Sequence, residues 1–395
     1  MAAIPKPIRI ARIITRFGVG GVERHVSTLT ANLDREKFQS WVICGRAGKN
    51  ERECLDFATS SGVEPVLIDN LRRNLGIWDI PASLTLHRVL ARIRPQIVET
   101  HQSKAGALGR CMARPIFRSN GQRPRLIHTF HCHQFEGYFS NPATRVFVTI
   151  ERVLARFTDM IVTVTPTIRQ TLIETYQIAN PSKIRVVPLG FDFEWLREIP
   201  LHRGWLRARL GVDDSIIIFG FVGRLTMIKN IHMLLRAFAR MLRSNSVSAH
   251  LVIIGDGELR TELESLAYEL EIADRVTFCG WILDRAAMYC DLDVTCLSSF
   301  NEGSPVCLIE SLAAGIPVVA TNVGGVADII TDECHGELVR SGDEDAYAVA
   351  LARWAKRAGC MPSEGSKAVR DSFSIARLTA NMESIYLEVL AERPT

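Results

Sequence analysis

Short apolar runs alternate with longer amphipathic stretches through the N-terminal half of the chain. The short runs are rich in Val and Ile and have the length of buried strands, whereas the longer stretches repeat their apolar residues at helical spacing. The expected strands are residues 8–14, 41–44, 66–68, 97–100, 126–130, 160–164 and 184–187, and the expected helices include residues 22–33, 83–93, 144–157 and 167–176. Strands that alternate with helices build parallel sheets with helices on both faces, so the expected fold class is α/β.

The same alternation restarts in the C-terminal half. The polar, irregular segment 190–203 separates the two series and predicts a hinge between two Rossmann-like lobes, residues 1–200 and 201–374. A final helical pattern predicts that residues 375–395 can pack back on the N-terminal lobe. Ligands in open α/β sheets bind beyond the carboxyl ends of the strands, so with two parallel sheets facing each other the site is expected in the cleft between them. The second series comprises strands at 216–222, 251–254, 276–278, 294–297 and 317–320, and helices near 231–243, 258–270 and 305–314.

Composition narrows the class of protein without identifying it. The chain has 395 residues, enough for two domains, and 47% apolar and 23% charged residues are ordinary for a globular protein. A net charge of +4 is small, so no nucleic-acid partner is expected. No window approaches the roughly 18 apolar residues of a membrane-spanning helix. The ten cysteines form no CxxC pair, which is typical of reduced thiols in a cytoplasmic protein.

Three strand-to-helix connections carry features of phosphate binding. The glycines of Gly18–Gly21 would let backbone amides approach an anion, but the third glycine of a dinucleotide fingerprint is missing, so a plain tight turn is the alternative. Gly223, Arg224 and Lys229 follow a strand where two cations could hold a diphosphate; solvated charges are the alternative. Gly255–Gly257 flank an acidic turn residue, as many ordinary turns do.

The segment around Glu302 carries the strongest pattern. Ser304 is a favoured N-cap and Pro305 suits the first helical position, so a helix is expected to begin there. Glu302 would then lie in the loop before the helix and Glu310 within it, and both carboxylates could reach one extended ligand. Backbone amides at the helix start suit a diphosphate. A purely structural cap is the alternative.

Taken together, these segments resemble the retaining glycosyltransferases with the GT-B fold, family four, of the group 1 type. The resemblance spans nearly the whole chain, and the order and spacing of the motifs are more specific than any one of them. The matching segments are Gly18–Gly21, the turn at His131, Gly223-Arg224 with Lys229, Gly255-Asp256-Gly257, Glu302 with Glu310, and Gly324-Gly325.

The resemblance implies a role for each matching residue. Arg224 and Lys229 would hold the donor diphosphate, and Glu310 would bond the nucleotide ribose. Glu302 would hold hydroxyls of the transferred sugar, and His131 would contact that sugar. The implied catalytic residues are His131, Glu302, Arg224 and Lys229, and the implied donor-binding residues are Gly20, Gly21, Gly223, Gly255, Gly257, Gly303, Ser304, Pro305, Val306 and Glu310.

His131 lies among other histidines and has alternatives to a sugar contact. It ends an apolar strand, so it could be a core histidine with satisfied hydrogen bonds. A metal site would need His128, His131 and His133 to converge, but strand alternation places only His131 and His133 on one face. No metal site is therefore expected.

The reaction implied by the resemblance moves a sugar, of hexosyl type, from a nucleotide sugar to an acceptor. The resemblance implies retention by same-face attack, with the leaving phosphate as base, and a UDP-sugar as the favoured donor. Arg224, Lys229 and the helix N-terminus could stabilise the leaving group without a metal, so no cofactor is expected. The alternatives are a nucleotide-sugar epimerase, a nicotinamide-dependent dehydrogenase suggested only by the glycine loop, and a non-catalytic nucleotide-sugar-binding subunit.

The acceptor is expected to bind the N-terminal lobe. Similar proteins suggest a saccharide or lipid-linked acceptor in polysaccharide or glycolipid assembly. A basic stretch could contact an anionic membrane surface from the cytoplasmic side, with a solvated charged face as the alternative. That stretch comprises Arg110, Arg114, Arg118, Arg123 and Arg125.

Overall fold

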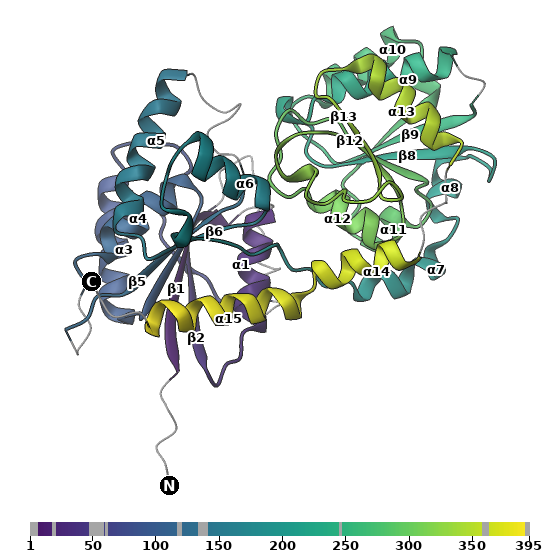
Figure 1. Ribbon diagram of the computed structural model, residues 1–395. Helices are drawn as coiled ribbons and strands as arrows, with labels where there is room; N and C mark the ends of the chain where they lie inside the picture. The colour runs from purple at the N-terminus through teal and green to yellow at the C-terminus, as the bar shows by residue number, and fades with distance from the viewer. Residues whose placement is uncertain are drawn as a thin grey trace. The chain divides into compact units, whose positions relative to one another are not determined.

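A computed structural model describes the chain as two compact units. The described residues are 7–17, 21–46, 59, 62–116, 121–132, 141–244, 247–357 and 363–391. Unit 1 comprises Met1–Phe191 together with Phe373–Thr395, and unit 2 comprises Asp192–Ser372. Both units are α/β structures built on a parallel sheet, which confirms the predicted fold class (Figure 1).

Unit 1 is built on a seven-stranded parallel sheet with the strand order β3-β2-β1-β4-β5-β6-β7. The strand order reverses between β1 and β4, which are hydrogen-bonded neighbours. Because the strands are parallel, their carboxyl ends all lie at one edge of the sheet. The strands are β1 (Ile8–Phe17), β2 (Phe38–Arg46), β3 (Val66–Leu67), β4 (Ile97–His101), β5 (Arg125–Phe130), β6 (Met160–Thr163) and β7 (Ile184–Val186).

Two layers of helices cover the faces of this sheet. α1 (Gly21–Asn32) and the C-terminal helix α15 (Ile375–Ala391) share one apolar core with residues of β1, β4 and β5 (Figure 1). α3 (Asp79–Ile93) and α4 (Ser103–Ala113) share the core on the other face. The last helix therefore completes the first unit although it follows the second in sequence. The remaining helices are α5 (Asn141–Arg156), α6 (Pro166–Gln170) with the π-helical turn η1 (Thr171–Thr175), and η2 (Pro181–Lys183).

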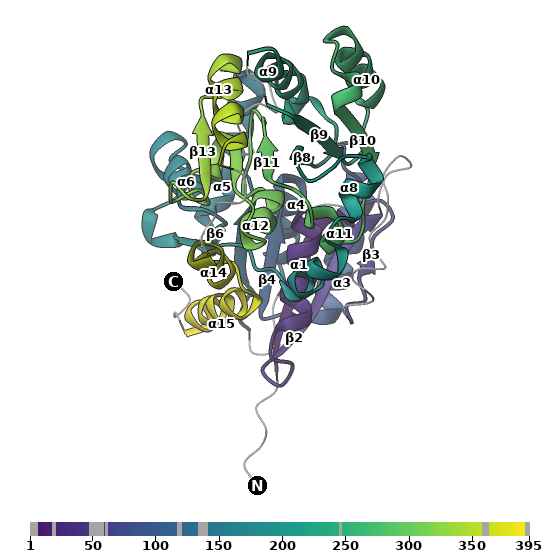
Figure 2. The same ribbon diagram turned by 90° about the vertical axis from the view of Figure 1, so that its right-hand side faces the viewer.

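Unit 2 is built on a six-stranded parallel sheet with the order β10-β9-β8-β11-β12-β13, so its order reverses between β8 and β11. α9 (Ile231–Ser244) and α13 (Glu344–Ala355) lie side by side on one face (Figure 2). The strands are β8 (Ile217–Val222), β9 (Ala249–Ile254), β10 (Val276–Gly280), β11 (Val294–Leu297), β12 (Val318–Thr321) and β13 (Gly336–Val339). The other helices are η3 (Glu194–Glu198), α7 (Ile199–His202), α8 (Trp205–Leu210), η4 (Met227–Lys229), α10 (Arg260–Glu269), η5 (Ala273–Arg275), α11 (Arg285–Tyr289), α12 (Val306–Ala313), η6 (Gly324–Val326) and α14 (Ser363–Ser372).

The boundary between the units differs from the one expected from sequence. The structure divides the chain after Phe191, whereas the sequence pattern placed the division after residue 200. The reason is packing, because Trp195 of η3 lies in the apolar core of unit 2 with Ile218 and Ile254. From Asp192 onward this segment therefore belongs to unit 2, and the chain returns to unit 1 at Phe373.

Most expected elements agree with the structure, but some were divided or missed. The helix expected at 167–176 is the short α6 continued by the π-helical turn η1. α4, β13 and α13 were not predicted, because β13 is a four-residue strand with a mixed burial pattern and α4 is rich in small residues. Within the described part of the chain, every helix is too short or too polar to cross a bilayer.

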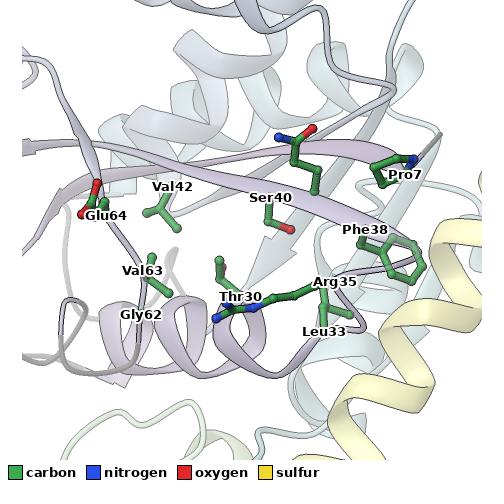
Figure 3. A pocket seen from close by; sticks show the side chains of 11 residues that line it. Pro7, Thr30, Leu33, Arg35, Phe38, Ser40, Val42, Gly62, Val63 and Glu64 are labelled. Carbon is green, nitrogen blue, oxygen red and sulfur yellow. The ribbon is translucent and has the colours of Figure 1, made fainter.

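One cavity of about 400 Å³ lies in unit 1 beside β2, between α1 and residues 62–64 (Figure 3). Its lining is mixed, with Phe38 and Val42 on the strand and Thr30 on the helix. Of the expected donor-binding residues that the structure describes, none lines it. The expected site residues lie instead at the carboxyl ends of the strands.

Candidate functional site

The site residues of unit 2 gather where the strand order reverses. β8 and β11 are neighbours, and their carboxyl ends lead into the loops that carry Arg224 and Glu302. Ligands of open parallel sheets bind at this switch point because the two adjoining loops diverge to opposite faces of the sheet. Phe300 links the two loops directly, since its backbone N–H donates to the carbonyl oxygen of Ile228 over 2.8 Å.

The three predicted glycines of this region bring two loops into close backbone contact. A Cβ on Gly255, whose φ is +137°, would collide with the carbonyl oxygen of Gly223. A Cβ on Gly257 would collide with the backbone of Leu225 in the same way. The amide of Leu225 donates to the carbonyl oxygen of Asp256 over 3.1 Å, which ties the loops together. Gly255 and Gly257 thus fix the backbone that carries Arg224.

Lys229 and Glu302 form an ion pair at this switch point. The Nζ of Lys229 lies 2.6 Å from Oε1 of Glu302, and the Ser299 hydroxyl donates to the same oxygen over 2.6 Å. The Ser298 hydroxyl donates to the carbonyl oxygen of Lys229 over 2.9 Å and holds the lysine backbone in place. Two predicted site residues that are 73 positions apart in sequence are therefore in direct contact.

The ion pair keeps Lys229 charged in a partly dry environment. Burial alone would lower the pKa of Lys229, but the Glu302 carboxylate beside it reverses this effect and the pKa is raised. Arg224 lies close enough to oppose that rise, and its side chain is exposed. Among the described residues, Arg224 makes no ion pair, so this guanidinium is available to an anion.

The beginning of α12 differs from the prediction. The structure places Pro305 at the N-cap, with ψ of 114°, and the helix begins at Val306, so Ser304 is not the N-cap. Pro305 itself has an extended ψ, so helical dihedrals begin only at Val306, and a proline at the N-cap leaves no N–H of its own to satisfy. The Ser304 hydroxyl is buried and has no hydrogen-bond partner among the described residues. A buried hydroxyl without a partner beside a helix N-terminus is suited to an anionic ligand.

Glu310 lies within α12, as the sequence predicted, and Glu302 lies in the loop before it. Glu310 is buried, and its Oε2 accepts a hydrogen bond from the Tyr289 hydroxyl over 3.2 Å. Oε1 lies 3.6 Å from Nη1 of Arg285, which stacks over Trp195. These partners were not anticipated, because they come from α11 and η3 and no sequence spacing links them to Glu310.

The site residues of unit 1 lie at the carboxyl ends of β1, β4 and β5. Gly21 begins α1 directly after the loop that follows β1, while Gly20 lies outside the described residues. His131 follows β5 and is half-buried. His101 ends β4, the central strand between the other two. Unit 1 thus also collects its polar side chains at the point where its strand order reverses.

Three histidines from these ends form one cluster. Nδ1 of His101 lies 3.0 Å from Nε2 of His131, and the ring of His25 on α1 packs edge-on against His131 at 5.1 Å between centroids. Burial lowers the pKa of His131 to about 3. Burial, with the neighbouring rings and Arg12, holds the pKa values of His25 and His101 well below their usual range. All three rings are therefore neutral at neutral pH.

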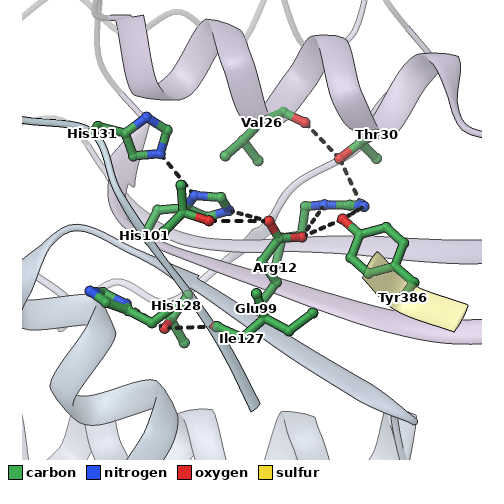
Figure 4. A network of polar contacts seen from close by, with 11 residues as sticks. Arg12, Val26, Thr30, Glu99, His101, Ile127, His128, His131 and Tyr386 are labelled. Atoms are coloured by element: carbon green, nitrogen blue, oxygen red, sulfur yellow. Dashed lines mark hydrogen bonds and ion pairs between the residues drawn. The ribbon is translucent and has the colours of Figure 1, made fainter. Parts of the chain in front are cut away.

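A buried network supports this cluster (Figure 4). Oε2 of Glu99 accepts hydrogen bonds from Nε of Arg12 over 3.1 Å and from the Tyr386 hydroxyl over 2.6 Å. Tyr386 also accepts from Nη2 of Arg12 over 2.9 Å. Oε1 of Glu99 lies 3.6 Å from Nε2 of His101. Sequence reasoning missed Glu99 and Tyr386, although a carboxylate within an apolar strand was a signal of a buried partner.

His128 does not join the cluster. Its Nδ1 lies 2.8 Å from the Thr100 hydroxyl, and a Cβ on Gly106 would collide with its ring, so it packs against α4 on the other face of the sheet. His133 lies outside the described residues. The nitrogen atoms of His25, His101 and His131 lie within 4.8 Å of one another, so these three, and not the set weighed from sequence, are close enough to share a ligand.

The prediction that five arginines form an exposed basic face on unit 1 is wrong for two of them. Arg110 is fully buried and donates to both carboxylate oxygens of Glu151, over 2.9 and 2.7 Å. Arg125 pairs with Asp159 over 2.9 Å. The reason is that α4 packs against the sheet on the side that carries Arg110, so this charge needs a buried partner. Arg114 and Arg123 are exposed, and Arg118 lies outside the described residues.

Two family models match the chain and together cover most of its length. The model described as "Glycosyltransferase Family 4" matches residues 19–195, and the model described as "Glycosyl transferases group 1" matches residues 205–364. The first match covers the region of the histidine cluster and the second covers the switch point with Arg224, Lys229 and Glu302.

Individual relatives and one solved structure extend this result. A UDP-Gal:alpha-D-GlcNAc-diphosphoundecaprenol alpha-1,3-galactosyltransferase of Escherichia coli is 26% identical and aligns over 100% of both chains. A D-inositol 3-phosphate glycosyltransferase of Acidothermus cellulolyticus is 31% identical over 76% of this chain and 68% of its own length. The structure of Anabaena Alr3699/HepE in complex with UDP-glucose has the same fold, with a TM-score of 0.74, 18% identity, and coverage of 96% of this chain and 100% of that one.

Proposed function

The chain belongs to the group 1 glycosyltransferases of the GT-B fold, and from this premise we propose that it transfers a sugar from a UDP-sugar to a saccharide or lipid-linked acceptor. The E. coli relative is named for a UDP-sugar donor and a diphosphoundecaprenol acceptor, and the Anabaena protein binds UDP-glucose. Both support the donor class, and the first supports acceptors of polysaccharide or glycolipid assembly.

The observation that carries the proposal is the arrangement of charge at the switch point of unit 2. The exposed guanidinium of Arg224, the paired ammonium of Lys229 and the unpartnered Ser304 hydroxyl beside the N-terminus of α12 are all suited to a diphosphate. Glu302 would hold sugar hydroxyls while its other oxygen partners Lys229, and Gly303 and Val306 would offer backbone amides. Glu310, set deeper in α12, would accept from the ribose.

Transfer would proceed by departure of the diphosphate. As the bond between the anomeric carbon and the phosphate oxygen lengthens, negative charge develops on that oxygen and positive charge on the sugar. Lys229 and the first-turn amides of α12 are held in place before the reaction and, together with Arg224, would stabilise the developing negative charge, so the step would need no metal. The acceptor hydroxyl then forms the new bond, and its proton passes to the leaving phosphate.

We propose retention of configuration on the resemblance to the retaining GT-B glycosyltransferases of family four. Glu302 contacts Lys229, one of the proposed diphosphate contacts, and is already bound to Lys229 and Ser299. A carboxylate held in this way is a weak nucleophile, so retention would proceed by attack of the acceptor on the face that the diphosphate leaves rather than through a covalent glycosyl-enzyme. His131 would contact a hydroxyl of the transferred sugar.

A peripheral contact with an anionic membrane would bring a lipid-linked acceptor to unit 1. α5 exposes Val146, Ile150 and Val153 to 58%, 42% and 49%, and their spacing places them in one stripe. Arg145, Arg152 and Arg156 are exposed along one side of that stripe, which suits anionic head groups. This helix replaces the stretch around Arg110 as the candidate surface.

The test is a transfer assay preceded by a donor screen. UDP-, GDP- and ADP-sugars are added to the purified protein, and thermal unfolding is measured; a donor at 100 times its dissociation constant stabilises the fold by about 2.7 kcal/mol. The stabilising donor is then incubated with lipid-linked and free saccharides in the presence of EDTA. We expect a UDP-sugar to be transferred with an unchanged anomeric configuration, read by NMR. An inverted product, a requirement for metal, or epimerisation without an acceptor would contradict the proposal.

A further inference from the structure

We propose that Glu99 and His101 are positioning residues that fix the proton of His131 on Nε2, so that His131 presents an unprotonated Nδ1 to a hydroxyl of the sugar. The sugar contact itself rests on the proposed function. The chain of groups runs from the Glu99 carboxylate through the His101 ring to the His131 ring (Figure 4).

The first link is the buried carboxylate. Both Glu99 and His101 are fully buried, and Oε1 of Glu99 lies 3.6 Å from Nε2 of His101. A negative charge at this distance in a dry environment favours the tautomer that carries its proton on the facing nitrogen. Within the described residues Nε2 of His101 has no hydrogen-bond partner, so nothing competes with that preference.

The second link is the contact between the two rings. His101 is neutral and has only one ring proton, so a proton on Nε2 leaves Nδ1 as an acceptor. Nδ1 of His101 lies 3.0 Å from Nε2 of His131, a distance that requires one proton between the nitrogens. That proton must then belong to His131. The remaining nitrogen of His131, Nδ1, is left with a free lone pair.

Glu99 is itself held by elements distant in sequence. Arg12 on β1 and Tyr386 on α15 both donate to its Oε2, so Oε1 remains directed toward His101. The Thr129 hydroxyl, on β5, lies 3.5 Å from Oε1. The C-terminal helix thus takes part in orienting His131, although 255 positions separate Tyr386 from it in sequence.

A metal ion held by His25, His101 and His131 is the competing arrangement. Three neutral imidazoles within 4.8 Å could bind Zn²⁺. Two observations disfavour it. Burial and the neighbouring rings lower the pKa values of His25 and His101 most, and the guanidinium of Arg12 lowers them further, so Arg12 also opposes a second cation. The nearby carboxylate, Glu99, is already bound by Arg12 and Tyr386 and would not offset the charge.

Nitrogen NMR of the full-length protein labelled with ¹⁵N-histidine tests the tautomer directly. The resonances of His131 are assigned by their loss in His131→Gln. Without any donor we expect a protonated Nε2 and an unprotonated Nδ1 on His131. The opposite tautomer would overturn the proposal. So would stoichiometric Zn²⁺ in the purified protein, measured by atomic emission and lost in His25→Ala.

Two variants of His101 separate orientation from simple packing. Asn places its carbonyl oxygen near the position of Nδ1, so His101→Asn keeps an acceptor for His131, whereas His101→Leu removes it. We expect His101→Leu to lose the single tautomer and about 10- to 100-fold in kcat/KM, as for other partners that orient a functional imidazole. His101→Asn should recover the tautomer and most of the rate. Equal losses in both variants would show a packing role and overturn the proposal.

The readouts distinguish this inference from the proposed function. The tautomer is measured in the absence of substrate, so a wild-type protein that transfers no sugar leaves the NMR result intact and removes only the sugar contact. Conversely, normal UDP-sugar transfer by wild type and His101→Leu alike would keep the proposed function and remove the positioning role. Thermal unfolding of each variant, compared with wild type, identifies any loss that is due to misfolding.

Discussion

Each unit has an ion pair near its strand-order reversal, and the two pairs differ in burial and in how many protein partners they have. In unit 1, Arg12 and Glu99 are fully buried, and each of their hydrogen-bonding groups is used by a neighbour such as Tyr386. In unit 2, Lys229 and Glu302 are 22% and 10% exposed at the side chain and lie beside an exposed Arg224 and an unpartnered Ser304 hydroxyl. An ion pair whose hydrogen-bonding groups all have protein partners holds other residues in place. An ion pair beside groups that lack such partners is available to a ligand.

The largest expected effect is on the buried pair. Arg12→Ala leaves Glu99 charged and buried with a lost partner, so the free energy of unfolding should fall by about 3–5 kcal/mol. Urea denaturation measures it. The double variant Arg12→Met/Glu99→Leu, which removes both charges, should recover much of the loss. A single variant as stable as wild type would show that the pair is solvated and that the contrast between the units is false.

Acid should act on unit 1 through its buried histidines. The pKa values of His25, His101 and His128 are held well below their usual range, so each stabilises the fold above about pH 6.5, and this stability is lost as the pH falls. At pH 5.5 each should account for about 1.4 kcal/mol. Urea denaturation at pH 7.5 and 5.5 measures the difference in the free energy of unfolding. His101→Asn should reduce this difference by the contribution of one histidine, about 1.4 kcal/mol. Identical stability at both values would mean that the rings are solvated.

Lys229 of the open pair, and Glu310 in the neighbouring helix α12, should matter for turnover more than for stability. Lys229→Ala, and separately Glu310→Ala, should each remove about 2–4 kcal/mol of transition-state stabilisation, which is a loss of about 30- to 1,000-fold in kcat/KM. Steady-state transfer assays measure the loss. Lys356→Ala, at an exposed lysine of the same unit, is the matched control. Full activity of both site variants with unchanged melting would remove the site assignment.

The smallest expected effect is at the surface of α5. Replacing Val146, Ile150 and Val153 together by Ser should weaken binding to vesicles that contain anionic lipid by about tenfold, which corresponds to about 1.4 kcal/mol. Co-sedimentation measures it, and stability should be unchanged because these side chains are exposed. The same three changes at Leu75, Ile77 and Ile80, also exposed, serve as the control. Equal binding of wild type and the α5 variant would exclude this helix as the contact.

Local pattern predicted the elements that carry the site with useful accuracy. The strand before Arg224 and the helix around Glu310 were both expected, and Glu302 was correctly placed in the loop between strand and helix. The exact start of that helix was wrong by one residue, because Pro305 itself takes the extended geometry of the N-cap and the helix begins at Val306. The burial of Arg110 was also missed, since its partner Glu151 is 41 positions away.

The α/β class, the two series of strands and helices, and the residue types suited to a diphosphate could all be predicted from the amino-acid sequence. These depend on local periodicity and on turn chemistry, which neighbouring residues encode. Which of those residues come into contact depends on the folded arrangement, as with Lys229 and Glu302 or Tyr386 and Glu99. These residues are 73 and 287 positions apart, and their contacts depend on strand order and helix packing. Neither strand order nor helix packing can be read from the local periodicity of one sequence.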